Sequence, residues 1–268
     1  HTTPTALSTG RAVLAGASVG DYALFAGGYI GPSSVVDAYS ADLTHTTPTE
    51  LSAARSFLAG ASVGDYALFA GGYTGSSSNV VDAYDTDLTR STPTVLSIAR
   101  KKVAGASVGD YALFAGGYAG SYSNVVDAYD TNLTHTTPTA LSTARHQLAG
   151  ASVGDYALFA GGSGPSSVVD AYSANLTRTT PTALSTARRE LAGASVGDYA
   201  LFAGGYTGSY SSAVDAYTTF VSTTYLPITA GSKYKLNSTT ETTATKNTVI
   251  KVSSPITGYI KYKGGKFE

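Results

Sequence analysis

The stretch from Arg55 to Ala99 reads RSFLAGASVGDYALFAGGYTGSSSNVVDAYDTDLTRSTPTVLSIA, and nearly all of residues 1–218 repeats it. A Gly-Asp dipeptide marks each copy, at Gly20, Gly64, Gly109, Gly154 and Gly197. The spacing between copies is therefore 44, 45, 45 and 43 residues. A fixed period of this length is typical of a solenoid, a propeller or another repeat array.

Each repeat contains four short segments separated by turn signals. In order they are LAGASV, YALFAGG, VVDAY and TPTALS, with Gly-Asp, a Gly/Ser loop and Asp/Asn-Leu-Thr between them. Four short strands per repeat predict the blade of a β-propeller and not a helical hairpin.

The repeat resembles the Kelch motif in spacing as well as in residue type. An apolar segment ends in Gly71-Gly72, a Gly/Ser loop follows, the next apolar segment ends in Tyr84-Asp85, and Arg100 comes sixteen residues after the tyrosine. Kelch repeats usually carry a tryptophan after the Tyr-Asp pair, and this chain has Thr46, Ser91, Thr136 and Thr179 there. The resemblance implies a propeller, but a fold of this kind hosts enzymes, cytoskeletal proteins and adaptors alike.

The two ends of the repeat region predict how the ring closes. Residues 1–8, HTTPTALS, copy residues 135–142, whereas the fifth repeat, residues 188–218, has no TPTALS segment. Pairing these two ends in one sheet gives an all-β, five-bladed propeller closed by an N-terminal strand, with no exposed sheet edges left at the junction. The small residues of LAGASV predict a crowded centre, and YALF is expected to pack between blades.

The remaining residues, 219–268, lack the repeat and differ in charge. Residues 1–218 carry ten Lys and Arg against sixteen Asp and Glu, and residues 219–268 carry seven against two. The segments TVIKVSS and GYIKYKGG alternate in polarity, which predicts a small, basic β-rich C-terminal module; a segment that orders only in an oligomer is the alternative. The ending also resembles the C-terminal segments of bacterial and prophage tail-associated repeat proteins.

The composition favours a non-enzymatic protein. There is no cysteine, hence no disulfide and no thiol chemistry, and no apolar run is long enough to span a membrane. The four histidines are not at metal-ligand spacing, and His45 and His135 alternate with Arg90 and Arg178 at a repeat position interpreted as a solvent-facing turn. The Gly-Gly doublets lack the Gly-Lys-Ser/Thr of a phosphate loop. We therefore expect no catalytic residues, no metal and no cofactor.

An arginine and an aspartate recur in every copy. The arginines are Arg11, Arg55, Arg100, Arg145 and Arg188, and the aspartates are Asp37, Asp82, Asp127, Asp170 and Asp215. A ring of arginines could bind an anion, but the equal numbers favour one-to-one ion pairs that pin the connections between blades.

The positions that differ between copies predict the binding site. The two residues after each arginine are Ala12-Val13, Ser56-Phe57, Lys101-Lys102, His146-Gln147 and Arg189-Glu190. The loops after the Gly-Gly doublets also vary, and both sets are expected on one face around the axis of the ring, where binding residues concentrate. The predicted ligand-binding residues are Phe57, Lys101, Lys102, His146, Gln147, Arg189, Glu190, Tyr73, Tyr118 and Tyr206. Unselected drift at exposed positions is the alternative.

Two function classes remain. The first is an adhesion or receptor-binding module that recognises a cell-surface glycan or protein, with tyrosines as flat contact groups, in a phage or prophage tail or a bacterial surface fibre. The second is a purely structural or decorative domain of a larger extracellular assembly. The chain is expected to be extracellular or virion-associated and part of a longer chain or a homo-oligomer, without a nucleic-acid partner and without membrane insertion.

Overall fold

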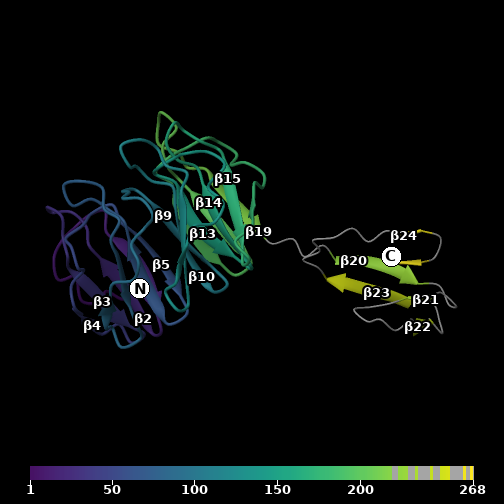
Figure 1. Ribbon diagram of the computed structural model, residues 1–268, viewed down its shortest axis with the longest axis horizontal. Helices are drawn as coiled ribbons and strands as arrows, with labels where there is room; N and C mark the ends of the chain where they lie inside the picture. Colours follow the sequence, from purple (N-terminus) through teal and green to yellow (C-terminus); the bar gives the residue numbers. More distant parts are fainter. Residues whose placement is uncertain are drawn as a thin grey trace. The chain divides into compact units, whose positions relative to one another are not determined.

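The chain divides into two compact units, residues His1–Thr219 and Phe220–Glu268 (Figure 1). A computed structural model describes residues 1–218 and, beyond them, the strand segments 223–228, 233–234, 242–243, 248–253, 262–263 and 266–267. Every regular element described is a β-strand. The predicted all-β fold class is confirmed.

The first unit consists of five antiparallel sheets that follow one another along the chain. Blade 1 contains β1 (Ala15–Val19), β2 (Tyr22–Ala26), β3 (Val36–Ser40) and β4 (His45–Thr46). Blade 2 contains β5 (Ala59–Val63), β6 (Tyr66–Ala70), β7 (Val81–Tyr84) and β8 (Arg90–Ser91). Blade 3 contains β9 (Ala104–Val108), β10 (Tyr111–Ala115), β11 (Val126–Asp130) and β12 (His135–Thr136). Blade 4 contains β13 (Ala149–Val153), β14 (Tyr156–Ala160), β15 (Val169–Ser173) and β16 (Arg178–Thr179). Blade 5 contains β17 (Ala192–Val196), β18 (Tyr199–Ala203) and β19 (Val214–Thr218). The predicted five-bladed propeller arrangement is confirmed.

The Gly-Asp dipeptide forms the tight turn between the first two strands of each blade. In blade 2, Val63 of β5 pairs with Tyr66 of β6, so Gly64 and Asp65 are the two turn residues. Gly64 has φ +49°, a conformation that glycine adopts without steric cost and that two-residue hairpins require.

The fourth strand of a blade differs from the predicted one. It comprises only the dipeptide before the TPT sequence, as in Arg90–Ser91, and TPTALS itself is not a strand. That segment instead crosses to the next blade, where the Thr49 carbonyl accepts a hydrogen bond from the Tyr84 hydroxyl at 2.7 Å. The backbone N–H of Ser52 donates to Asp82 at 3.0 Å, so the segment links two blades.

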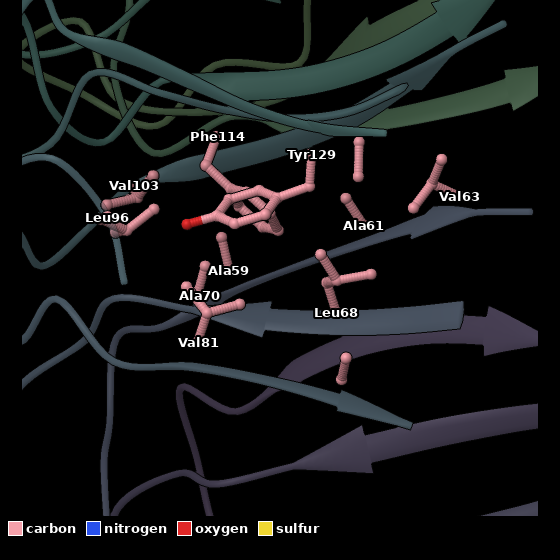
Figure 2. Packing of buried hydrophobic residues seen from close by; sticks show 12 residues of the cluster. Ala59, Ala61, Val63, Leu68, Ala70, Val81, Leu96, Val103, Phe114 and Tyr129 are labelled. Atoms are coloured by element: carbon pink, nitrogen blue, oxygen red, sulfur yellow. The ribbon is translucent and has the colours of Figure 1, made fainter. Parts of the chain in front are cut away.

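Apolar side chains of neighbouring blades form the core, as predicted for the YALF segment. Figure 2 shows Phe114 and Tyr129 of blade 3 packed with Ala59, Ala61 and Leu68 of blade 2. Equivalent clusters lie between blades 1 and 2, 3 and 4, and 4 and 5.

The innermost strands approach one another closely, which confirms the predicted crowded centre. A Cβ atom added to Gly60 of β5 would lie 2.2 Å from the carbonyl oxygen of Gly16 in β1, and Gly105 is placed in the same way against Gly60. The Ser62 hydroxyl donates to the Ser18 carbonyl at 2.6 Å across the same junction. Any larger residue at the glycine position would force the blades apart.

The ring of blades is not closed within the described residues. Consecutive blades contact each other through β1, β5, β9, β13 and β17 in turn. Figure 1 shows the blades following one another in chain order. The outgoing face of blade 5 has no blade against it: Val196 is 61% exposed, whereas Val153, its equivalent in blade 4, is 4% exposed. The incoming face of blade 1 is also open, since Phe25 is 37% exposed and its equivalent Phe202 is fully buried.

The predicted closure by residues 1–8 is wrong. The sheet of blade 5 has three strands, and residues 1–8 pair with none of them. These residues lie on blade 1 instead, where the Thr5 carbonyl accepts a hydrogen bond from the Tyr39 hydroxyl at 2.8 Å and the Ser8 N–H donates to Asp37 at 2.9 Å. The reason is that TPTALS is the linker of the repeat and always binds the blade that follows it.

Strand pairs are also described in the C-terminal unit. β20 (Thr223–Ile228) pairs with β23 (Thr248–Ser253), β21 (Lys233–Tyr234) with β22 (Thr242–Thr243), and β24 (Tyr262–Lys263) with β25 (Lys266–Phe267). β23 coincides with the predicted TVIKVSS strand, and β24 lies within GYIKYKGG. How this module folds as a whole lies outside the described residues.

Candidate functional site

The variable residues lie together on one face of the propeller, which we call the loop face. The first residue after each arginine pairs with the first residue of the loop that follows the Gly-Gly doublet. Isolated bridges join Ala12 to Tyr29, Ser56 to Tyr73, Lys101 to Tyr118 and Arg189 to Tyr206. In blade 4 the loop begins with Ser163 in place of tyrosine, and its N–H donates to the His146 carbonyl at 2.8 Å.

The second residue after each arginine lines an open pocket of about 570 Å³ at the axis. These axial residues are Val13, Phe57, Lys102, Gln147 and Glu190. The next residue of each repeat also lines the pocket, so that Leu14, Leu58, Val103, Leu148 and Leu191 contribute apolar surface. The volume is within the range of small-molecule sites in proteins.

All five axial residues have a left-handed backbone, although none is glycine. Their φ angles lie between 49° for Val13 and 57° for Glu190. Such a conformation costs about 1–3 kcal/mol for a residue with a Cβ atom, and it is least favourable for a β-branched residue such as Val13.

A chain of backbone hydrogen bonds across the blades accompanies this strain. The Phe57 N–H donates to the Val13 carbonyl at 3.1 Å, Lys102 N–H to Phe57 at 2.9 Å, Gln147 N–H to Lys102 at 3.4 Å, and Glu190 N–H to Gln147 at 3.0 Å. The fold therefore sets the backbone of the axial residues, and their side chains are left to vary.

The cationic side chains of the loop face lie over aromatic rings. The Lys101 ammonium lies 4.2 Å from the centre of the Tyr73 ring and 5.7 Å from that of Tyr118. Lys102 lies 5.4 Å from the Phe57 ring, and the Arg189 guanidinium 5.1 Å from Tyr206. These cation–π contacts hold the cations in place without neutralising their charge.

His146 lies among aromatic rings from the neighbouring blade. Tyr122 stacks on it with ring centres 4.7 Å apart, and Tyr118 lies at 5.6 Å. Burial lowers the pKa of His146, and the positive charges of Lys102 and Arg189 lower it further. Its Nδ1 atom is buried without a hydrogen-bond partner among the described residues. Tyr122, which is absent from the predicted site, belongs to it through this stack.

Gln147 connects the axial residues of blades 4 and 5. Its amide nitrogen donates to Glu190, and its amide oxygen accepts from the Ser163 hydroxyl at 2.8 Å. The serine that replaces the loop tyrosine in blade 4 thus orients Gln147.

The ten predicted ligand-binding residues therefore form two adjoining rows. Phe57, Lys102, Gln147 and Glu190 line the axial pocket. Lys101, His146 and Arg189 lie on the outer side, where Tyr73, Tyr118 and Tyr206 contact them or pair with them. Sequence spacing alone could not separate the rows, because the left-handed residues that form the axial row are not glycines and so carry no mark in the sequence.

The recurring arginines and aspartates form buried ion pairs, as predicted. Arg55 and Asp82 are both fully buried and in contact, and Arg145 lies 2.6 Å from Asp170. Arg55 also donates to the Gly71 and Val80 carbonyls at 2.7 Å each. The pairs hold the connection into each blade against its third strand.

The interpretation of His45 and Arg90 as solvent-facing is wrong. His45 lies 2.6 Å from Asp37, and Arg90 lies 3.0 Å from Asp82, so each is a second partner of the buried aspartate. Burial opposes ionisation of Asp37, but hydrogen bonds from Ser8, His45 and Arg11 outweigh it and lower its pKa to about 2.

Two further observations concern only the part of the chain that the structure describes. No three His, Asp or Glu side chains there are grouped as metal ligands. No helix there is long and apolar enough to cross a membrane.

Comparison with known proteins supports the fold. No protein-family model matches the chain, and no curated protein matches it. The solved structure of YjhT superposes with a TM-score of 0.64 at 14% identity, over 81% of this chain and 84% of that one. At this identity the similarity shows the β-propeller fold alone.

Proposed function

We propose that this Kelch-like propeller is a non-enzymatic binding module that recognises a cell-surface glycan or protein through its loop face. The distribution of sequence variation supports the proposal. The repeats keep the strands and the Gly-Asp turns of the opposite face, whereas the two residues after each recurring arginine, one in the outer row and one in the axial pocket, differ in every blade. A rigid scaffold with variable residues around one pocket is the usual arrangement of a recognition site.

The amino-acid types at this face fit recognition. Tyr122 and Tyr210 are exposed by 48% and 94%, and tyrosine offers a flat surface with a polar edge at little entropic cost. We propose that the protein acts outside the cell or on a virion, in a phage tail or a bacterial surface fibre. A purely structural role in such an assembly is the alternative.

A binding experiment with the full chain tests the proposal. The labelled protein is applied to a panel of bacterial cells and to arrays of glycans and surface proteins. The variant K101A/K102A/R189A is expected to lose binding to whatever the parent recognises, with its melting temperature unchanged. The control D65N/D110N/D155N, which alters exposed turns of the opposite face, is expected to bind as the parent does.

Two results would speak against the proposal. Binding equal to the parent's in both the cation variant K101A/K102A/R189A and the tyrosine variant Y118A/Y122A would move recognition elsewhere on the chain. Absence of binding to every cell, glycan and protein tested would favour the structural alternative.

A further inference from the structure

The charges of the propeller are divided between its two faces. Within residues 1–218, seven of the ten lysines and arginines pair with an aspartate: Arg11, Arg55, Arg90, Arg100, Arg145, Arg178 and Arg188. The other three are Lys101, Lys102 and Arg189, and all belong to the loop face. No carboxylate of residues 1–218 forms a salt bridge with them.

The carboxylates that do not pair with these arginines lie mostly in turns of the opposite face. Five of them are in the turns between first and second strands, namely Asp21, Asp65, Asp110, Asp155 and Asp198. Four more are at or within the turns between third and fourth strands, namely Asp42, Asp85, Asp87 and Asp130. The remaining two are Glu50, which accepts a hydrogen bond from the Ser34 hydroxyl in the loop between second and third strands, and Glu190 at the axial pocket, to which Gln147 donates a hydrogen bond. The loop face therefore carries an excess of positive charge.

The three cations are held where a ligand can reach them. Lys101, Lys102 and Arg189 lie over aromatic rings, which orient each charged group. Their N–H groups form no hydrogen bond to a carboxylate of residues 1–218. Lys102 and Arg189 come from blades 3 and 5, yet both lower the pKa of the same side chain, His146 of blade 4. Their fields thus overlap at His146.

Neutral hydrogen-bonding groups adjoin the cations. His146 has an unpartnered Nδ1, and the Ser56 hydroxyl is fully buried beside Phe57 without a partner among the described residues. A buried polar group without a partner is costly unless a ligand or water satisfies it. The exposed ring of Tyr122 stacks on His146.

We infer that the loop face binds an acidic saccharide, with the anionic group held by Lys101, Lys102 and Arg189 and a sugar ring against the tyrosines. The anion is a carboxylate, or a sulfate or phosphate ester. The inference rests on the proposed function and specifies its ligand class. A saccharide fits better than an acidic peptide, because the loop face places the imidazole of His146 against the flat rings of Tyr118 and Tyr122, and the amide of Gln147 lines the adjoining pocket.

The test compares matched glycans on one array, with the full chain as probe. Each acidic glycan is printed beside its neutral counterpart, made by reducing carboxylates or removing sulfate or phosphate esters. The parent is expected to bind the acidic members at least about tenfold more tightly, since a hydrogen bond to a charged group contributes about 1.5–3 kcal/mol. Binding is expected to weaken as salt is raised.

Variants assign the effect to the cations. K101A/K102A is expected to lose about tenfold or more in affinity for acidic glycans, so that it no longer prefers an acidic glycan to its neutral counterpart. K101R/K102R keeps the charges and is expected to keep most of the affinity. D65N/D110N serves as the control on the opposite face.

The failures of the inference and of the proposed function differ. Equal binding of acidic and neutral glycans, unchanged in K101A/K102A but lost in Y118A/Y122A, would overturn the anionic ligand and leave recognition at the loop face intact. Binding to a protein or acidic peptide, with no glycan bound, would also overturn the inference. Binding that no loop-face variant alters would overturn the proposed function as well.

Discussion

At the scale of single residues, the buried aspartate of each blade joins several segments of the repeat through ion pairs and hydrogen bonds. Asp127 contacts Arg100 and His135 and accepts a hydrogen bond from the Ser97 N–H at 2.9 Å. The arginine enters from the preceding linker, the histidine from the fourth strand, and the aspartate itself lies on the third strand. Three segments that sequence alone leaves separate are thereby fastened at one carboxylate.

Removing one cation should therefore be costly in a complete blade. Arg100→Met leaves Asp127 buried with one cationic partner fewer, and a broken buried ion pair costs about 3–5 kcal/mol. Arg188→Met is the matched control, because Asp215 of blade 5 is 15% exposed and has no fourth-strand partner among the described residues. Urea unfolding should show a clearly smaller loss in the free energy of unfolding for Arg188→Met than for Arg100→Met. Equal losses in the two variants would contradict the role of burial.

At the scale of elements, the axial residues show how the fold separates backbone from side chain. The left-handed turn at Lys102 supports a hydrogen bond to Phe57 in the neighbouring blade, and the side chain is free to point into the pocket. The backbone constraint is identical in five blades, and the chemistry differs in each.

Relief of that strain gives a prediction. Lys102→Gly should be more stable than Lys102→Ala by about 1 kcal/mol, because glycine adopts positive φ at no steric cost and alanine does not. Thermal unfolding of the two variants measures the difference, and both should lose the cation equally. A less stable glycine variant would contradict the left-handed conformation in solution.

The first eight residues give a second prediction at this scale. Deleting them removes the acceptor of the Tyr39 hydroxyl and one donor to Asp37, and each lost buried hydrogen bond costs about 1–3 kcal/mol. Hydrogen exchange should therefore accelerate in β3 of blade 1 and stay unchanged in β19 of blade 5. Faster exchange in β19 would instead support the predicted closure, in which residues 1–8 complete the sheet of blade 5.

At the scale of the whole molecule, the row of blades ends in two open faces. The outgoing face of blade 5 presents Val196, Tyr199 and Val214, and the incoming face of blade 1 presents Phe25. At the four junctions inside the row, the equivalent valines and phenylalanines are buried and the equivalent tyrosines are partly buried, as in the cluster of Figure 2.

Lysine substitutions distinguish an open ring from a closed one. Val196→Lys should change the free energy of unfolding by no more than about 0.5 kcal/mol, as is usual for exposed positions. Val153→Lys, at the equivalent buried position of blade 4, should cost several times more, because it buries a charge without a partner. Similar losses in the two variants would show that the faces meet in solution.

The repeat period, the blade count, the interblade core and the Arg–Asp pairs followed from the sequence, because each depends on a local pattern that recurs five times. YALFAGG is a short apolar run that ends in two glycines. Gly71 has a positive φ, and a Cβ atom on it would lie 2.6 Å from the Arg100 carbonyl oxygen. Repetition makes such a pattern visible, and one blade explains all the others.

Tertiary structure alone decided where each linker binds, which strand ends a blade, and whether the ring closes. Thr5 and Ser8 could pair with either end of the chain, and only the contacts with Tyr39 and Asp37 selected blade 1. His45 and Arg90 read as surface residues until the third strand brought a buried carboxylate beside them. The division of the variable residues into an axial and an outer row likewise required the left-handed backbone of residues such as Phe57. In each case the deciding contact joins segments about 8 to 45 residues apart. Such a pairing cannot be predicted from the local sequence of either segment.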